Sequence, residues 1–300
     1  MAAPLPCLTI AGPTASGKSE LALEIAERIN GDIIGADAFQ IYRGMGVLTA
    51  QTPENERRGI PHHLVGCIDP TQDFDVATYL KLAREKIIEV RAAGRKPILV
   101  GGTGLYIRAV LRGLAEGLPA ADPILRAQME SESLEDLVAK LVKLDPVAAT
   151  SVDLRNPRRV IRALEVCLLT GAPFTSFRAQ TTPLSAPVGI WITSSRSELH
   201  ARIELRAISM LKKGAIDEIA NIESELGLTA NQAIGISEII KFLRGQSTLE
   251  RVKEELVFKT RQYAKRQESW FSKDNDLVAT SKESAIESAQ RVMNLPPKPL

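Results

Sequence analysis

The residues with the clearest chemical signature lie near the amino terminus and match the pattern G-x-x-x-x-G-K-[ST]. They are Gly12, Pro13, Thr14, Ala15, Ser16, Gly17, Lys18 and Ser19. Glycines let the backbone curl so that successive N–H groups point at one anion, and Lys18 adds a full positive charge. The Ser19 hydroxyl is an oxygen ligand of the kind that Mg²⁺ accepts. These residues, the phosphate loop, predict a phosphate-binding site that uses Mg²⁺ with Ser19 as its metal ligand.

A carboxylate, Asp37, follows the second apolar run of the chain. In nucleoside triphosphatases a later apolar strand usually ends in an acid that serves Mg²⁺. Here the later run, 98–100, is followed by Gly101-Gly102-Thr103-Gly104 and by no acid. This departure argues against a nucleotide hydrolase. A small-molecule kinase with a phosphate loop stays open, because such enzymes carry a carboxylate beside the acceptor hydroxyl.

Two basic segments are suited to the phosphates of a nucleic acid. Arg158, Arg159 and Arg162 follow Asn156-Pro157, a good N-cap and first helical residue. The second segment, 259–273, carries five basic residues, Lys265 and Arg266 among them, against one acid. Both segments predict local positive patches, with a solvated helix face as the alternative. The pair Trp270-Phe271 is expected to anchor a helix in the core.

The elements that must position these residues alternate between strands and helices. Short apolar runs at 7–11, 32–36 and 97–100 read as strands, and helical spacing covers 20–29 and 76–92. This alternation predicts an α/β fold, a parallel sheet of the phosphate-loop type flanked by helices. Residues 114–188 read as an inserted all-helical domain. It separates a core segment, 1–113, from 189–300, in which one strand at 189–193 precedes C-terminal helices.

Composition excludes several classes of protein. The chain has 300 residues, 44% of them hydrophobic, and a net charge of +2, so it can bury a core and any basic site must be local. No apolar run approaches the ~20 residues that cross a bilayer, and residues 1–6 lack the features of a signal peptide. We therefore expect a cytoplasmic protein with no membrane contact. Cys7, Cys67 and Cys167 are expected to be small buried hydrophobes.

Six stretches of the chain together resemble the tRNA dimethylallyltransferase family, also called tRNA isopentenyltransferases. They are GPTASGKSELA at 12–22, ADAFQIYRGM at 36–45, PHHL at 61–64, KPILVGGTGLYIRAVLRGL at 96–114, RRVIRALEVCLLTG at 158–171 and TRQYAKRQESWF at 260–271. The family moves the dimethylallyl group from dimethylallyl diphosphate to N6 of the adenine that follows the anticodon on its 3′ side. The resemblance thus implies that the phosphate loop holds a diphosphate leaving group.

The resemblance also implies a role for each matching residue. Asp37 is the expected general base for the adenine N6, and Thr103 is expected to orient the diphosphate or polarise the breaking bond. Arg202 and Arg206, four residues apart on one helical face, complete the diphosphate clamp. The expected tRNA contacts are Asp37, Ala38, Phe39, Gln40, Arg158, Arg159, Val160, Ile161, Arg162, Lys265 and Arg266. The expected partners are the tRNA anticodon stem-loop and dimethylallyl diphosphate, with the chain acting as a monomer.

The sequence departs from the family pattern on the RNA side. Ala38 replaces a serine, 48–53 lacks a glycine and a lysine of the family, and Ile236-Ser237 replaces an aromatic and a basic residue. His62 and His63 lack metal-ligand neighbours and are expected to be structural or to line the substrate site. Three other functions remain open: a small-molecule kinase, a dimethylallyltransferase acting on free adenosine phosphate, and an RNA-binding protein whose catalytic site has decayed.

Overall fold

The computed structural model describes residues 7–115, 117–179 and 187–294. Its strands are β1 (Cys7–Ala11), β2 (Gly31–Ala36), β3 (His62–His63), β4 (Lys96–Gly101), β5 (Pro187–Thr193) and β6 (Val278–Ser281). Its α-helices are α1 (Lys18–Ile29), α2 (Gly46–Thr49), α3 (Val76–Ala92), α4 (Gly104–Arg112), α5 (Pro123–Glu130), α6 (Leu134–Leu144), α7 (Ala148–Ser151), α8 (Pro157–Thr170), α9 (Arg196–Lys212), α10 (Ala215–Ile222), α11 (Ile236–Leu243), α12 (Leu249–Phe271) and α13 (Ala285–Asn294). Short 3₁₀ turns lie at Glu54–Glu56, Phe174–Ala179, Glu223–Glu225 and Ala230–Gln232.

The chain divides into two compact units. Met1–Arg112 and Pro183–Leu300 form the sheet unit, and Gly113–Thr182 forms the helical unit. The expected insertion, 114–188, differs from the helical unit at its end, because β5 begins at Pro187 and pairs with β1 from that residue.

The sheet unit is built on six parallel strands in the order β3-β2-β4-β1-β5-β6. β1 lies between β4 and β5, with Ile10 opposite Val100 and Ile190. Because the strands are parallel, the loops that follow β1, β2 and β4 leave the same edge of the sheet. The phosphate loop, Asp37 and Thr103 follow β1, β2 and β4, so the topology brings them to one edge.

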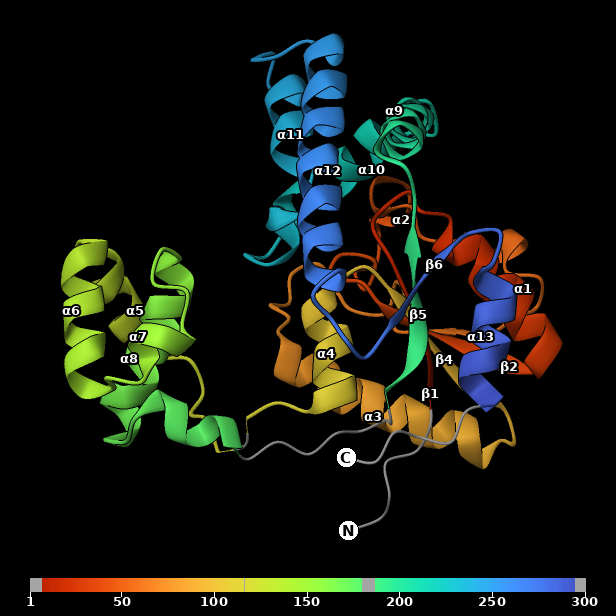
Figure 1. Cartoon of the computed structure of the whole chain (residues 1–300). Coiled ribbons are helices and arrows are strands. Elements are labelled where there is room, and N and C mark those ends of the chain that lie inside the picture. Colours follow the sequence, from red (N-terminus) through yellow and green to blue (C-terminus); the bar gives the residue numbers. More distant parts are fainter. Residues whose placement is uncertain (1–6, 116, 180–186, 295–300) are drawn as a thin grey trace. The chain divides into compact units, whose positions relative to one another are not determined.

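Alternating side chains along the strands form one core on each face of the sheet. Ile10 and Ile98 face α1 and α13, whereas Leu99 and Ile34 belong to the core formed with α3, α4 and the helices α9 to α12. Figure 1 shows α1 and α13 together on one side of β5. A sheet buried on both faces explains why its strands read as continuous apolar runs and not as alternating ones.

The helical unit has its own core. Buried residues of α5, α6, α7 and α8, with Leu141 and Val160 at its centre, pack together. Asn156 caps α8 by accepting a hydrogen bond from the Arg159 N–H at 3.3 Å, Pro157 is its first residue, and Gly171 ends it with φ 67°. The predicted start of this helix is therefore confirmed.

Several predictions about the elements were wrong. The structure has two further strands, β3 and β6, of which β6 lies in a stretch expected to be helical. Both are edge strands, and three of the four β6 residues are exposed, so β6 has no apolar run to mark it. Cys7 and Cys167 are buried as expected, but Cys67 is exposed. No helix in the described parts of the chain is long and apolar enough to cross a bilayer.

Candidate active site

The phosphate loop connects β1 to α1 with two residues in the left-handed region, Ala15 at φ 62° and Gly17 at φ 89°. The Ser16 N–H donates to the Pro13 carbonyl at 3.2 Å, and the Lys18 Nζ donates to the same carbonyl at 3.3 Å. Alternating right- and left-handed residues point successive N–H groups to one side, which makes a concave anion site at the helix start. The Ser16 hydroxyl is fully buried and has no partner among the described residues, so a bound oxyanion could satisfy it.

A pocket opens beside this loop, and we call it the phosphate pocket. It is lined by Ala15, Gly17, Lys18, Ser19, Glu20, Leu23, Thr52, Glu56, Arg202 and Arg206. The structure therefore brings the two predicted arginines to the predicted loop. Basic groups outnumber acidic ones here, and loop N–H groups add to the positive potential.

Burial lowers the pKa of Lys18 to about 8, the nearby Asp37 carboxylate raises it, and Arg206 lowers it further. Burial also lowers the pKa of Arg206, and Asp37 opposes that shift. Arg206 donates from Nη2 to the Thr49 carbonyl at 3.1 Å. Among the described residues, neither Lys18 nor Arg206 has a carboxylate within 4.0 Å. The fold thus holds two cations close together without a paired anion, which favours a ligand that carries negative charge.

A second pocket adjoins the first, because Arg206 lines both. We call it the apolar pocket, and most of its lining is hydrocarbon. It is lined by Thr14, Asp37, Phe39, Leu48, Thr49, Ile203, Arg206, Ala207, Met210, Ala233, Ile234, Leu256, Thr260 and Tyr263. These residues come from the phosphate loop, the segment after β2, helices α2, α9 and α12, and the turn before α11.

Asp37 is held in a defined orientation at the wall of the apolar pocket. Its Oδ1 accepts hydrogen bonds from the backbone N–H groups of Phe39 at 3.0 Å and Gln40 at 3.2 Å. The Gln40 Nε2 donates to the Thr49 and Ala50 carbonyls, each at 3.0 Å. With its Nε2 used in this way, the Gln40 side chain retains its Oε1 as an acceptor.

Thr103 lies in the loop after β4 and connects that loop to the Asp37 segment. Its Oγ1 accepts from the Ala38 N–H at 3.0 Å, and its own N–H donates to the Ala36 carbonyl at 3.1 Å. Burial raises the pKa of Tyr263, and the nearby side chains of Thr103 and Gln267 lower it by a smaller amount. Thr103 thus lies beside the segment of the expected base, and the side chains that line the two pockets are those of other residues.

The predicted RNA-binding arginines lie on α8 in the helical unit, where their surroundings differ. Arg162 forms an ion pair with the fully buried Glu165 and donates to the Pro119 carbonyl at 2.7 Å. Arg126 holds the same carboxylate at 2.8 Å. Burial raises the pKa of Glu165, but the hydrogen bonds from Arg126, Arg162 and the Asp122 N–H outweigh it. The pKa of Glu165 is therefore lower than its ordinary value. Arg162 is therefore part of the internal structure of this unit.

Arg159 is more accessible, with 53% of its side chain exposed and Asp153 3.6 Å away. Val160 and Ile161 were expected beside it as RNA contacts, and that expectation needs correction because both are buried in the core of the helical unit.

On α12, Lys265 and Arg266 are exposed. The Arg266 guanidinium lies 5.6 Å from the centre of the Tyr263 ring, which lines the apolar pocket. Phe271 is buried, and Trp270 packs on the core against Gly104, where a Cβ would come within 2.3 Å of the indole. The expected core anchor at the end of this helix is confirmed.

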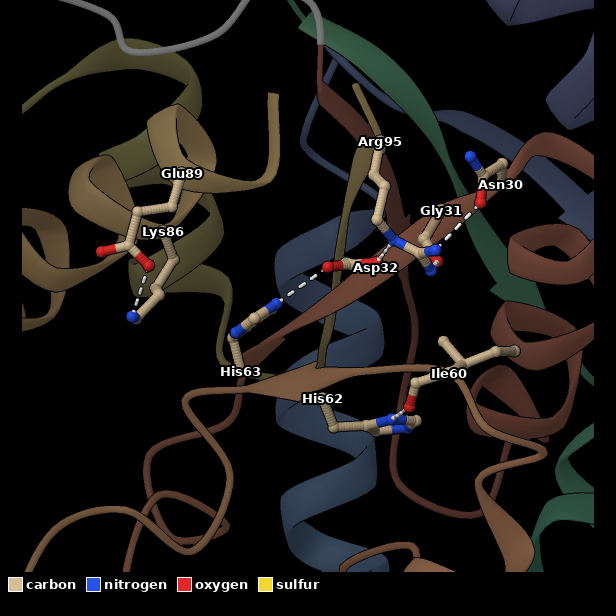
Figure 2. Close-up of polar contacts among 9 residues, drawn as sticks. All are labelled: Asn30, Gly31, Asp32, Ile60, His62, His63, Lys86, Glu89 and Arg95. Carbon is tan, nitrogen blue, oxygen red and sulfur yellow. Dashed lines mark hydrogen bonds and ion pairs between the residues drawn. The ribbon is translucent and has the colours of Figure 1, made fainter. Parts of the chain in front are cut away.

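The two histidines have structural partners. His62 Nδ1 lies 2.9 Å from the Ile60 carbonyl, and His63 Nε2 lies 3.1 Å from an oxygen of Asp32. Arg95 holds the other oxygen of this buried Asp32, as Figure 2 shows. No group of three or more His, Cys, Asp or Glu side chains in the described residues is arranged to hold a metal. A Mg²⁺ ion would therefore take its ligands from the Ser19 hydroxyl, water and ligand oxygens, a set that suits this ion.

Two residues near the site escaped sequence reasoning. Gln267 on α12 accepts from the Thr14 N–H, so that amide is not free to bind an anion. Lys282, in the turn after β6, lies against Gly17: a Cβ on that glycine would be 3.5 Å from the Lys282 ammonium. Gln267 was visible within the stretch TRQYAKRQESWF, but Lys282 lies beyond all six stretches, after a strand that no pattern marked.

Comparisons with known proteins show which family the chain resembles. The sequence model of a family described as IPP transferase matches residues 40–274. A tRNA dimethylallyltransferase of Thermobifida fusca is 43% identical over 279 residues, which cover 89% of this chain and 87% of that protein. One from Maricaulis maris is 38% identical over 306 residues, which cover 97% and 99%.

Solved structures are similar as well. The full-length tRNA isopentenylpyrophosphate transferase of Bacillus halodurans matches with a TM-score of 0.70 and 35% identity, covering 96% of this chain and 95% of that one. A eukaryotic dimethylallyltransferase acting on tRNA matches with a TM-score of 0.79 and 27% identity, covering 98% and 81%. Two adjoining pockets, one cationic and one apolar, stand on the fold that these relatives share, and the chain belongs to the IPP transferase family.

Proposed function

We propose that this protein transfers the dimethylallyl group from dimethylallyl diphosphate to N6 of the adenosine that follows the anticodon of tRNA. The N6 nitrogen attacks C1 of the allylic group, the C1–O bond breaks, and diphosphate leaves with the bonding electron pair. The proton lost from N6 passes to the Asp37 carboxylate. The products are N6-dimethylallyl adenosine in the tRNA and free diphosphate.

The observation that carries this proposal is that the two pockets meet at Arg206, with Asp37 in the wall of the second. A phosphate ester with a short hydrocarbon tail matches this pair, because the cationic pocket suits diphosphate and the apolar pocket suits five carbons. A phosphoryl acceptor of a kinase would need no such apolar lining.

The barrier falls when growing charge meets donors that are already in place. Lys18, Arg202 and Arg206 face the phosphate pocket and would stabilise the departing diphosphate. We assign Pro13, Thr14, Ser16 and the loop glycines to the frame that holds these groups, and Ser19 to Mg²⁺. When bound, Mg²⁺ would neutralise part of the diphosphate charge.

On the acceptor side, an adenine amine is a weak nucleophile until a proton leaves it. Asp37, with Oδ1 occupied by two backbone donors, has its other oxygen for that proton. The Gln40 carbonyl oxygen would accept the second N6 hydrogen and so fix the amine. Thr103 acts through Ala38 by holding the Asp37 segment.

The RNA itself would lie on exposed basic residues. We propose Arg158 and Arg159 of the helical unit, within residues 114–188, and Lys265 and Arg266 of α12 as phosphate contacts. The adenine must leave its stack to reach Asp37. We also propose that the protein acts as a monomer in the cytoplasm.

The experiment that tests this function offers the protein alternative donors and acceptors. The protein is incubated with Mg²⁺, unmodified tRNA and either dimethylallyl diphosphate or ATP, and the digested RNA is analysed by mass. We expect five added carbons on one adenosine, with the first donor alone. Transfer to free adenosine phosphate but not to tRNA, or ATP turnover without any transfer, would overturn the proposal.

A further inference from the structure

One buried side chain connects the loops that carry the two halves of the site. The Gln267 Oε1 accepts a hydrogen bond from the Thr14 N–H at 2.8 Å, and its Nε2 donates to the Gly102 carbonyl at 2.8 Å. Gln267 is 5% exposed. A Cβ on Gly102 would come within 2.2 Å of its amide nitrogen, so the β4 loop approaches this amide as only glycine allows.

The two loops leave neighbouring strands, since β1 pairs with β4 in parallel. Thr14 belongs to the phosphate loop, and Gly102 precedes Thr103, whose hydroxyl accepts from the N–H of Ala38, next to Asp37. A continuous set of hydrogen bonds thus runs from the phosphate loop through Gln267 and the Gly102-Thr103 loop to the segment of the expected base.

The helix that carries Gln267 is fixed on both sides of it. Tyr263, one turn earlier, contacts Thr103 and Gln267, and Trp270 packs against Gly104 in the same β4 loop. Side chains spaced 263, 267 and 270 lie on one helical face. This face of α12 therefore contacts both loops, and Gln267 forms one hydrogen bond to each of them.

We propose that Gln267 is a positioning residue that sets the distance between the diphosphate and the Asp37 carboxylate. The inference rests on the proposed transfer reaction. An amide suits this role because it offers one acceptor and one donor to two backbone groups that face each other. Because reactive geometry is strict, a displacement of about 1 Å costs on the order of 10²-fold in rate.

Two variants test this role. Gln267→Met keeps the volume and removes both hydrogen bonds. Gln267→Glu keeps the acceptor for Thr14 but, when ionised, turns a carboxylate oxygen toward the Gly102 carbonyl. When protonated, the same side chain donates to that carbonyl and restores both bonds. Burial raises the pKa of such a carboxyl toward the range in which enzymes are assayed. Tyr263 is the titratable group beside this position, and Asp37 and Arg206 line the same pocket as Thr14, while Lys18 interacts with both of them.

We expect Gln267→Met to lower kcat by about 10- to 100-fold while the Kd values for diphosphate and tRNA change little. For Gln267→Glu we expect kcat relative to the parent to rise as the pH falls from about 8.5 to 6. A matched control is Gln246→Glu, an exposed glutamine in the turn before α12, whose kcat should follow the parent at every pH.

The outcomes separate this inference from the proposed function. An inactive parent enzyme would refute the proposed transfer. An active parent whose Gln267→Met variant retains the parental kcat would refute the positioning role. If Gln267→Met does not fold, Gln267→Glu still tests the role. A ratio of its kcat to the parental kcat that does not change with pH, as expected for Gln246→Glu, would also refute the positioning role.

Discussion

Arg206 in the sheet unit and Arg162 in the helical unit are both helical arginines in segments expected to bind phosphate, yet their surroundings differ. Arg206 donates to the Thr49 carbonyl and has no carboxylate within 4.0 Å among the described residues. Arg162 is paired with Glu165, whose side chain is fully buried. A cation without a paired anion can bind a negatively charged ligand. A cation in a buried ion pair instead neutralises its partner and cannot be removed without leaving that partner buried and unpaired.

The same contrast applies to stability. Holding Lys18 and Arg206 in this place costs free energy in the absence of an anion, because burial lowers both pKa values and Arg206 lowers that of Lys18 further. The Glu165 cluster stabilises its unit only while all its partners are present. Substitutions in the two regions should therefore change different measured quantities.

Among the changes that compare the two regions, the largest effect is expected from Lys18→Met. Removing one preset donor to a developing oxyanion typically lowers kcat by about 10²- to 10³-fold. The free energy of unfolding should stay the same or rise, since a poorly solvated charge is removed. Steady-state kinetics and urea unfolding measure the two quantities. A variant that loses stability and activity in parallel would contradict the contrast between the two regions.

The reverse pattern is expected from Arg162→Met. It leaves the buried Glu165 with Arg126 and the Asp122 N–H, and loss of a charged hydrogen bond destabilises by about 2 kcal/mol, or roughly 30-fold in the unfolding equilibrium. Affinity for dimethylallyl diphosphate should not change. Arg155→Met is the control, because that side chain is 97% exposed. Equal stability of the two variants would show that the Glu165 cluster does not support the helical unit.

The pH dependence of donor binding sharpens the difference further. The pKa of Lys18 is lowered to about 8 in the folded protein, so the unfolded chain binds more protons between that pH and 10.5. Stability of the ligand-free protein should thus rise with pH in this window. A bound diphosphate favours the charged amine, so its affinity should fall about fivefold from pH 8 to 9 as Lys18 loses its proton. Titration calorimetry measures this, and Lys18→Arg should abolish the dependence.

The smallest effect is expected from Arg159→Ala on the accessible face of α8. Loss of one phosphate contact should reduce the slope of log K against log salt by about 1, which is roughly fourfold between 50 and 200 mM. Fluorescence binding of tRNA over this salt range measures it. An unchanged slope would place the RNA surface elsewhere.

Local patterns predicted the parts of the fold that depend on neighbours in sequence. The helix over 76–92 has the predicted bounds, and Asn156-Pro157 begins α8 as its capping chemistry requires. The edge strand β6 could not be found, because its residues are largely exposed and it is recognised by its pairing with β5.

The candidate site shows the same division. The phosphate loop and Asp37 stand out because each follows an apolar strand. Gln267 does not, since its two partners lie 253 and 165 residues away in the chain. Arg162 was placed among RNA contacts, although Glu165 lies three residues on, because sequence does not show that this carboxylate is buried.

The most direct measurement is the single-turnover rate of dimethylallyl transfer to tRNA by Asp37→Asn, with donor affinity measured on the same preparation. The amide keeps the shape and the backbone hydrogen bonds of the carboxylate but cannot take a proton from N6. We expect a rate lower by about 10²- to 10⁴-fold with donor affinity retained. A variant that transfers the group at the parental rate would contradict it.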